Sequence, residues 1–407
     1  MSLQLLTLMI ASAGMALVAL SHNAFPVYFM FAALTAVLLV SYVTSRFSPR
    51  ALVCRREVAD RVFENEPITI TVELFNRGRL PRFLVTVRDR LPRFLESDQA
   101  LSFVLPALWP AEGTSLSYEA RARKRGVYPL GPLGVSVSDP FGMFLRYARV
   151  ETRGEAIVYP RPLPLDGRLG TTGLEARSRT TGEHSRASES GLDFYGIRDY
   201  QPGDELRRIH WPATAHHGQL TVIEFDRGAS VNLAVVLDTR VGTEFGRGVD
   251  TTLEVGVRAA ASLIHWALRS NGLAFFAADS AQGPRCLGVD HLDAEYEILE
   301  VLARVKSDGG MPASALLDWA APRLPSGAAI FVITATPDDE LPSVIASLRY
   351  GQLRTAVLVL DAHSFDSRAG HPTAMIGVLE AAGAATVEIR RDDDLQEALG
   401  SALVVGD

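Results

Sequence analysis

Two uncharged apolar runs near the start of the sequence constrain the fold of this chain more than any other feature. Residues 3–20 and 27–43 contain no Asp, Glu, Lys or Arg, and a short polar segment separates them. Each run is close to the length of about 17–25 residues that a helix needs to cross the hydrocarbon of a bilayer. We therefore predict a two-helix transmembrane hairpin over residues 1–45. A cleaved signal peptide is not expected, because residues 1–4 carry no basic side chain.

The charges beside these runs predict the side of the membrane on which the chain lies. Four arginines closely follow the second run, namely Arg46, Arg50, Arg55 and Arg56. The connection between the two runs has no Lys or Arg. Because short loops rich in Lys and Arg stay on the cytoplasmic side, we expect the bulk of the chain in the cytoplasm and a multi-pass anchor.

Charge and cysteine content limit the partners of the remaining chain. The 407 residues carry a formal net charge of −7, whereas proteins that neutralise nucleic-acid phosphates usually have a basic excess. Binding of nucleic acid is therefore not expected. Cys54 and Cys286 lie far apart in the sequence, so they predict neither a disulfide framework nor a cysteine-based zinc site.

Residues 46–163 have the alternating pattern of half-buried strands. Apolar residues at every second position include Ile68, Ile70, Val72 and Leu74, and a period of two is typical of antiparallel strands. Turn-forming Asn, Gly and Pro residues separate these stretches. We predict a β-sandwich (Ig-like) domain that acts as a spacer or as a docking surface, since a fold by itself supplies no chemistry.

Residues 229–407 alternate between apolar strands and helical stretches. Residues 231–237 form a continuous apolar run, and residues 250–270 place apolar side chains on one stripe of a helix. This alternation predicts an α/β domain with a mostly parallel sheet that helices cover on both faces. Residues 164–190 are rich in Gly, Thr, Ser and Arg, which predicts a flexible linker before it.

Asp238 ends the first strand of this domain, a position where ligands gather in an open parallel sheet. The order of elements resembles a von Willebrand factor A domain, whose first strand normally ends in the metal-binding pattern Asp-x-Ser-x-Ser. Here Arg240 and Gly242 replace the two serines, and an arginine repels a cation that needs oxygen ligands. We therefore expect no cofactor and no Mg²⁺: Asp238 is the only retained position of a degenerate adhesion site, a loop residue paired with Arg240.

Residues 191–228 combine charged, aromatic and turn-forming residues more densely than any other stretch. A buried charge without a partner is unstable, so these side chains are expected to form a network or to face a ligand. A Tyr-Gln-Pro-Gly turn precedes Asp204, which is suited to cap a short helix. The candidate partner-binding residues are Arg198, Tyr200, Asp204, Arg207, Arg208, His210 and Trp211.

Three interpretations of this segment stay open. Its charged and aromatic side chains can lock it onto the sheet through charge-assisted hydrogen bonds and stacking. They can also form a docking face, because Trp, Tyr and Arg dominate the energetics of protein interfaces. In the third interpretation, His210, His216 and His217 act as ligands or general bases. Because their spacing matches no zinc motif and no nucleophile with a base accompanies them, we assign no catalytic residue.

The same segment contains a long motif with fixed spacing, Phe-x-x-Ile-Arg-x-Tyr-x-Pro-Gly-Asp-x-x-Arg-x-Ile-x-Trp, which starts at Phe194. This motif resembles the signature of the bacterial family called domain of unknown function 58. The resemblance extends upstream to Arg-Gly-Val-Tyr at 125–128, Asp-Pro-Phe-Gly at 139–142 and Val-Tyr-Pro at 158–160. It therefore covers most of the chain.

The resemblance implies a non-enzymatic role. Members of the family look like partners of MoxR-type AAA+ ATPases, which implies a membrane-anchored cytoplasmic adaptor for complex assembly or cell-envelope processes in the bacterial inner membrane. A protein partner is expected, and a small-molecule substrate is not. The alternative is a metal-dependent binding protein or a hydrolytic enzyme that uses Asp238 and the His and Arg residues of the signature.

Overall fold

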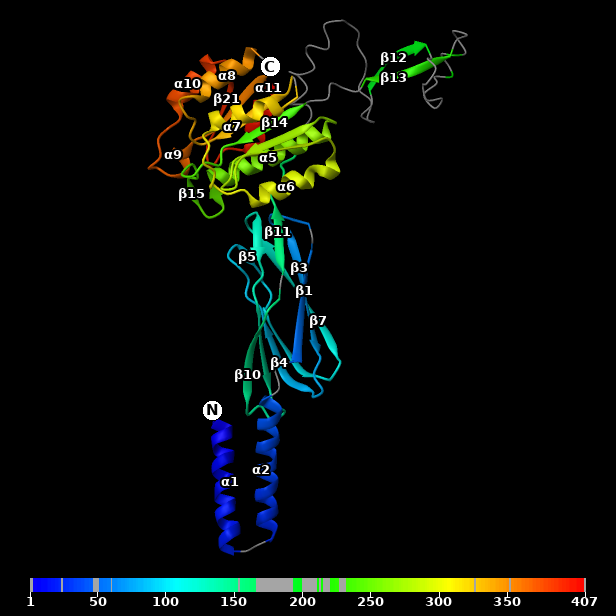
Figure 1. The fold of residues 1–407 in the computed structure, drawn as a ribbon, viewed down its shortest axis with the longest axis vertical. Coiled ribbons are helices and arrows are strands. Elements are labelled where there is room, and N and C mark those ends of the chain that lie inside the picture. Colours follow the sequence, from blue (N-terminus) through cyan, green and yellow to red (C-terminus); the bar gives the residue numbers. More distant parts are fainter. Residues whose placement is uncertain are drawn as a thin grey trace. The chain divides into compact units, whose positions relative to one another are not determined.

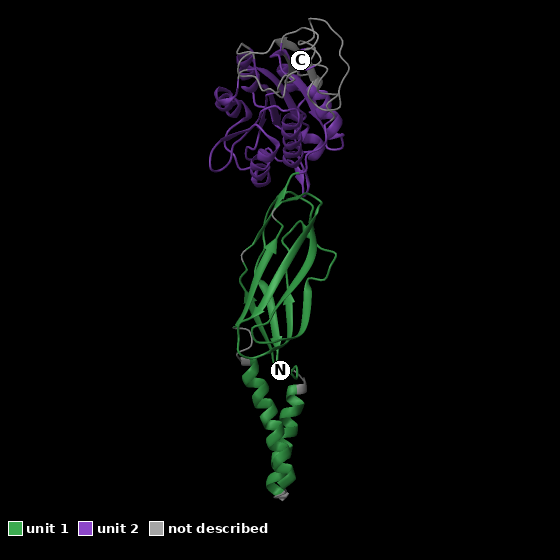
Figure 2. Cartoon of the chain, turned by 90° about the vertical axis from the view of Figure 1, so that its right-hand side faces the viewer, with its two compact units in different colours: residues 1–160 green, residues 161–407 purple. Residues whose placement is uncertain are grey.

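The protein consists of two compact units, residues 1–160 and residues 161–407 (Figure 2). The structure is a computed structural model that describes residues 3–22, 25–46, 51–59, 61–152, 154–165, 193–199, 211, 214, 220–226, 232–325, 327–350 and 353–405. Each unit contains a hydrophobic core of its own.

The first unit opens with two helices, α1 (Leu3–His22) and α2 (Phe25–Arg46). Among the residues described, one helical stretch is long and apolar enough to cross a membrane, Phe25–Ser45, with a mean hydropathy of 2.0. Only 6% of this stretch is buried inside the protein, so it is not a core helix. The apolar part of α1, Leu5–Ser21, is shorter than such a span. An N-terminal apolar helix is therefore present, whereas the second crossing stays a prediction.

Short strands, most of them antiparallel, make up the rest of the first unit. They are β1 (Leu52–Val58), β2 (Val62–Phe63), β3 (Pro67–Asn76), β4 (Arg82–Arg88), β5 (Leu95–Glu96), β6 (Ser102–Leu108), β7 (Gly113–Ala122), β8 (Gly126–Pro129), β9 (Leu133–Ser138), β10 (Leu145–Val150) and β11 (Glu155–Tyr159). Two sheets have the strand orders β1-β3-β7-β5 and β10-β9-β4-β6, and a small third sheet joins β2, β11 and β8.

The alternation in the sequence places one face of each four-stranded sheet in a common core. On β3, Ile68 and Ile70 are fully buried, and they belong to the same cluster as Val85 of β4 and Val135 of β9. Full burial of such a side chain contributes roughly 1.5–3 kcal/mol. The sheet-rich domain is thus confirmed, and its Ig-like connectivity stays a prediction.

The second unit is built on a six-stranded mixed sheet with the order β18-β17-β14-β19-β20-β21 (Figure 1). The strands are β14 (Leu233–Leu237), β17 (Ala274–Ala278), β18 (Arg285–Val289), β19 (Ala329–Thr334), β20 (Arg354–Leu360) and β21 (Ala385–Ile389). Neighbouring strands are parallel except at one edge, where β18 pairs antiparallel with β17. Every residue of β14 is buried, as expected for a strand covered on both faces.

Helices cover both faces of this sheet. The longer ones are α5 (Thr252–Arg269), α6 (Glu295–Arg304), α7 (Ala313–Ala320), α8 (Leu341–Tyr350), α10 (Thr373–Ala381) and α11 (Leu395–Val405). Helices α5, α6 and α11 pack on one face, and α7, α8 and α10 pack on the other (Figure 1). The predicted α/β unit with a mostly parallel, doubly covered sheet is confirmed, and the von Willebrand A-like assignment stays a prediction.

Helix α5 shows how local sequence fixes an element beside the candidate site. The Thr251 side chain accepts a hydrogen bond from the Glu254 N–H at 3.3 Å, the arrangement of a Thr-x-x-Glu capping sequence. The helix ends where Asn271 adopts a φ of 54° and the Gly272 N–H donates to the Ala267 carbonyl. The Asn-Gly stop in the sequence therefore acts as a left-handed C-terminal cap.

Candidate functional site

The candidate site lies where the strand order of the second unit reverses. From β14 the chain continues to β17 on one side and later to β19 on the other. The loops that follow β14 and β19 therefore run in opposite directions, and ligands bind at such points in open α/β sheets. Asp238 follows β14 directly, and Thr334 is the last residue of β19.

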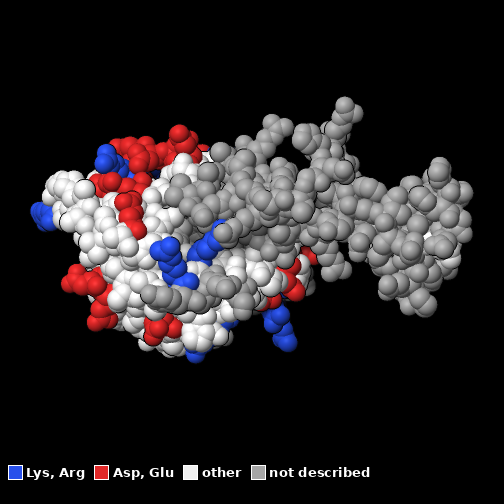
Figure 3. Space-filling model, turned by 90° about the horizontal axis from the view of Figure 1, so that it is seen from above, with Lys and Arg blue, Asp and Glu red and all other residues white. Residues whose placement is uncertain are grey.

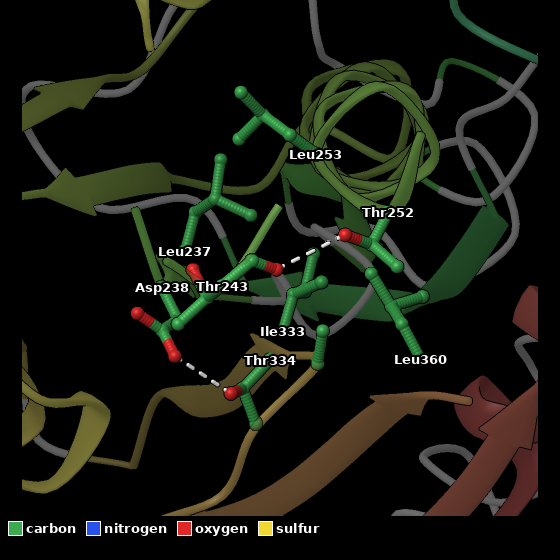
Figure 4. A pocket seen from close by; sticks show the side chains of 9 residues that line it. Leu237, Asp238, Thr243, Thr252, Leu253, Ile333, Thr334 and Leu360 are labelled. Atoms are coloured by element: carbon green, nitrogen blue, oxygen red, sulfur yellow. Dashed lines mark hydrogen bonds between the residues drawn. The ribbon is translucent and has the colours of Figure 1, made fainter. Parts of the chain in front are cut away.

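Asp238 is 7% exposed, and neighbouring groups bond both of its carboxylate oxygens. Oδ2 accepts a hydrogen bond from the Thr334 hydroxyl at 2.8 Å (Figure 4), and Oδ1 accepts one from the backbone N–H of Arg240 at 3.0 Å. Burial raises the pKa of Asp238 above its usual value, although these two hydrogen bonds and the charge of Arg240 oppose the rise. Asp238 therefore pairs with Arg240 through the backbone amide.

The Arg240 side chain instead reaches across to the loop after β19. Its Nη2 donates to the carbonyl oxygen of Thr336 at 3.2 Å and to the Thr336 hydroxyl at 2.9 Å. The Arg240 carbonyl accepts hydrogen bonds from the hydroxyls of Thr243 and Ser307, both at 2.7 Å. A positive charge is thus fixed between the ends of β14 and β19.

Asp279 organises the neighbouring loop in a way that sequence reasoning did not identify. This residue follows β17 and is 5% exposed. Its Oδ2 accepts hydrogen bonds from the N–H groups of Gly310 and Met311 at 2.7 and 2.8 Å, and its carbonyl accepts one from the Thr239 hydroxyl at 2.6 Å. Gly309 packs so closely that an added Cβ would lie 3.1 Å from the Cβ of Asp279. The signal available in the sequence was an Asp directly after an apolar strand.

Little space remains beneath Asp238. The cavity there has a volume of about 10 Å³, which is roughly the space that one water molecule occupies. Leu237, Leu253 and Ile333 form much of its wall, and the Thr252 hydroxyl bridges to the Thr243 carbonyl at 3.1 Å (Figure 4). The cavity therefore cannot hold a substrate.

The chemistry available at these strand ends is limited. Mg²⁺ takes close to six oxygen ligands, whereas Asp238 and Thr334 already bond each other and the adjacent loop position is an arginine. No group of three or more His, Cys, Asp or Glu that could hold a metal is found within the described part of the chain. Charge on the face of the second unit drawn in Figure 3 is mixed, with acidic and basic side chains interspersed among the residues shown in colour.

Most of the candidate partner-binding residues lie outside the described residues, namely Tyr200, Asp204, Arg207, Arg208 and His210. Arg198 belongs to β12 (Asp193–Asp199), which pairs antiparallel with β13 (Thr221–Asp226) and places Arg198 opposite Val222. The Trp211 side chain is 65% exposed. The two ends of the signature segment thus pair as a β-hairpin. Whether the segment packs on the sheet, binds a partner or has a catalytic role is not tested by these contacts.

Comparison with known proteins finds a family match in the second unit. Residues 196–305, which span β12 to the end of α6, match the family model described as "Protein of unknown function DUF58". This match covers part of the second unit and supports a relationship to the DUF58 family. A curated relative, the uncharacterized protein YeaD of Bacillus subtilis, is 24% identical over 275 residues. That alignment covers 66% of each protein, so the chain spans just under two thirds of the relative's length.

Similarity to solved structures is weak. The CARDB domain of a Pyrococcus furiosus protein is 16% identical over 25% of this chain and 94% of that domain, with a TM-score of 0.17. Native alpha-2-macroglobulin of E. coli is 14% identical over 25% of this chain and 7% of that protein, with a TM-score of 0.19. At these TM-scores neither likeness carries an argument about fold or function.

One motif upstream of the matched segment has a structural explanation. In Asp-Pro-Phe-Gly, the Asp139 carboxylate accepts hydrogen bonds from the N–H groups of Phe141 at 3.1 Å and Phe144 at 2.6 Å. Gly142 has a φ of +71°, a conformation that other residues adopt only at an energetic cost. The motif therefore makes the turn between β9 and β10.

Proposed function

We propose that this protein is a membrane-anchored adaptor that binds protein partners on the cytoplasmic side without a metal ion. The proposed partner is a MoxR-type AAA+ ATPase, and the proposed setting is complex assembly or a cell-envelope process. The N-terminal apolar helix supports the anchor. The positive-inside rule supports the orientation, because Arg46, Arg50, Arg55 and Arg56 follow that helix.

The position of Arg240 is the observation that carries the proposal. Arg240 stands in the sequence where the first serine of a metal-dependent adhesion motif would be, and Thr336 holds its guanidinium between the ends of β14 and β19. An arginine can donate several hydrogen bonds in a fixed plane to carboxylate or carbonyl groups of a partner. Val241, the next residue, is 68% exposed, so an apolar contact is available beside the charge.

Exposure of Trp211 supports a docking face in the signature segment. Tryptophan carries a large apolar surface, and it is among the residues most enriched at binding hot spots. A side chain that is 65% exposed in the free chain has surface to lose when a partner covers it. We infer that Arg198, Arg207 and Trp211 belong to one partner-binding face.

The second crossing belongs to the proposal as well. The Ser12 hydroxyl of α1 lies 3.3 Å from the Thr35 hydroxyl of α2. Polar contacts of this kind hold helices together in a bilayer, where hydroxyl groups have no water to bond. This contact supports insertion of α1 and α2 as one hairpin in the inner membrane.

The proposal is tested by crosslinking the full chain in native membranes and recovering the ATPase with it. Truncation of a hot-spot tryptophan costs about 2 kcal/mol or more, or roughly thirtyfold in affinity, so Trp211→Ala should abolish most of the recovery. Trp109→Ala is the matched control, because Trp109 is 59% exposed and lies in the first unit, outside the signature. Full recovery of the ATPase with each of the variants Trp211→Ala, Arg198→Ala and Arg207→Ala would refute the proposed docking face.

A second candidate function is metal-dependent binding or hydrolysis at Asp238. The observation that favours it is the place of this buried carboxylate at the reversal of strand order. Binding of a divalent ion that depends on Asp238 would distinguish this candidate from the adaptor.

A further inference from the structure

A larger hollow lies next to the candidate site, on the sheet face that α6 covers. Its volume is about 280 Å³, close to the lower limit of about 300 Å³ for ligand pockets. Phe276 of β17, Leu287 of β18, and Val301 and Val305 from the end of α6 give it apolar walls. Asp279 lines it too, and this residue also holds the loop over the strand ends. The hollow has room for a group about the size of one amino-acid residue.

The charged residues that line this hollow are of both signs, three basic and two acidic. Arg285, Arg304 and Lys306 contribute three positive charges, against the carboxylates of Asp279 and Asp308. Two backbone N–H groups already bond the Asp279 carboxylate, which lowers its effect on a ligand. Because Arg304 is paired with Glu300, Arg285 and Lys306 remain against the carboxylate of Asp308, and an anionic group gains from contact with them.

The basic side chains differ in the hydrogen bonds and ion pairs that they already form. Arg285 donates to the side chain of Gln282 at 2.8 Å, and Arg304 bonds Glu300 one turn back along α6 at 3.0 Å. Within the described part of the chain, Lys306 is exposed and no hydrogen bond or ion pair involves it. An ammonium group without a partner can reorient toward a bound anion at little cost.

We propose that this hollow binds an aliphatic carboxylate, with the hydrocarbon against Phe276 and Leu287 and the carboxylate at Lys306 and Arg285. The apolar walls favour an aliphatic group, because removing it from water stabilises the complex. The basic residues select the ionised acid, since charge-assisted hydrogen bonds are about twice as strong as neutral ones. This site goes beyond the proposed adaptor function and does not depend on it.

Two sources supply this chemistry, the free C-terminus of a peptide that ends in an aliphatic residue and a small organic acid. The test uses the full chain in lipid nanodiscs and ligand-observed NMR, with empty nanodiscs as the blank. The probes are acetyl-Gly-Gly-Leu with a free carboxylate, the same peptide as its C-terminal amide, and 4-methylpentanoate. The expected result is binding of the free acid at least about tenfold tighter than that of the amide.

Variants on the rim separate this site from adventitious binding. Lys306→Gln and Arg285→Gln should each weaken binding of the free acid about tenfold, and Asp308→Asn should leave it unchanged or tighter, because it removes a negative charge. Arg247→Gln is the control, an exposed arginine that does not line the hollow. If the peptide acid binds more tightly than 4-methylpentanoate, the ligand of this site is a peptide C-terminus. If the two bind equally, the ligand is a small organic acid.

Equal binding of acid and amide would overturn the proposal, as would binding that neither Lys306→Gln nor Arg285→Gln weakens. The probes bind without any ATPase present. Failure of this site is therefore distinguishable from failure of the adaptor function.

Discussion

Replacing Gly309 by alanine tests how tightly the loop over the candidate site is packed. The new Cβ would lie 3.1 Å from both Cβ and Oδ2 of Asp279 and 3.2 Å from its carbonyl carbon. These distances are shorter than the optimal separation of about 3.5–4.0 Å between non-bonded carbon atoms, so Asp279 would have to move. Its movement would weaken the hydrogen bonds to the N–H groups of Gly310 and Met311.

The expected loss of stability follows from these contacts. Overpacking of a tight site costs about 1–3 kcal/mol, and hydrogen bonds to a charged group contribute roughly 1.5–3 kcal/mol. Because the site can relax in part, the expected total loss of stability is about 3 kcal/mol. In a unit of this size, 1 kcal/mol lowers Tm by about 2–4 °C, so Gly309→Ala should lower the Tm of the second unit by about 6–12 °C.

The assay is thermal unfolding of the full chain in nanodiscs, followed by the fluorescence of Trp266, which is 5% exposed in α5, and of Trp319 in α7. Gly310→Ala is the matched control, because no heavy atom lies within 4 Å of its added Cβ. It should leave Tm unchanged or raise it slightly, since alanine restricts the unfolded chain. Equal Tm values for the two variants would refute the close packing of Gly309 on Asp279.

Two further predictions concern buried groups in the first unit. The Asp89 Oδ2 accepts hydrogen bonds from Arg56 Nη2 at 2.6 Å and from the Tyr118 hydroxyl at 2.5 Å, with the Arg56 and Asp89 side chains 0% and 2% exposed. Asp89→Asn should lower the free energy of unfolding by about 3–5 kcal/mol, because it leaves a buried guanidinium without its counter-charge. Backbone hydrogen exchange in β1 and β7 should therefore be faster than in the control variant Asp98→Asn, which changes an exposed residue. Equal exchange rates in the two variants would contradict this prediction. Burial raises the pKa of Cys54 to about 11, so at pH 8 a thiol reagent should modify the half-buried Cys286 well before Cys54. Similar labelling rates in the native protein would show that Cys54 is not buried.

Periodicity in the sequence was sufficient to predict the regular elements of the second unit. The helix expected at residues 250–270 is α5, and its apolar stripe faces the core, with Val257, Ala261 and Ile264 fully buried. The strand expected at residues 231–237 is β14. The edge strand β18 was missed, because Arg-Cys-Leu-Gly-Val has no alternation and all of its residues except Val289 are exposed or only partly buried. Helix α8 was missed as well.

The candidate site was predictable only in part. Asp238 follows an apolar strand, so its place at the strand ends could be read from the sequence. Sequence alone could not show that the Arg240 guanidinium bonds Thr336, 96 residues further on. It also could not show that the N–H groups of Gly310 and Met311 donate hydrogen bonds to Asp279. Such contacts depend on how the loops cross above the sheet. The role of the signature residues stays a proposal.

The central claim is that Arg240 supplies the positive charge at the strand ends, so that partner binding needs no metal. The most direct measurement is isothermal titration of Mg²⁺ and Mn²⁺ into the full chain in nanodiscs, with empty nanodiscs subtracted. We predict no heat beyond the blank, and the same result for Asp238→Ala. Micromolar binding that Asp238→Ala abolishes would contradict the claim.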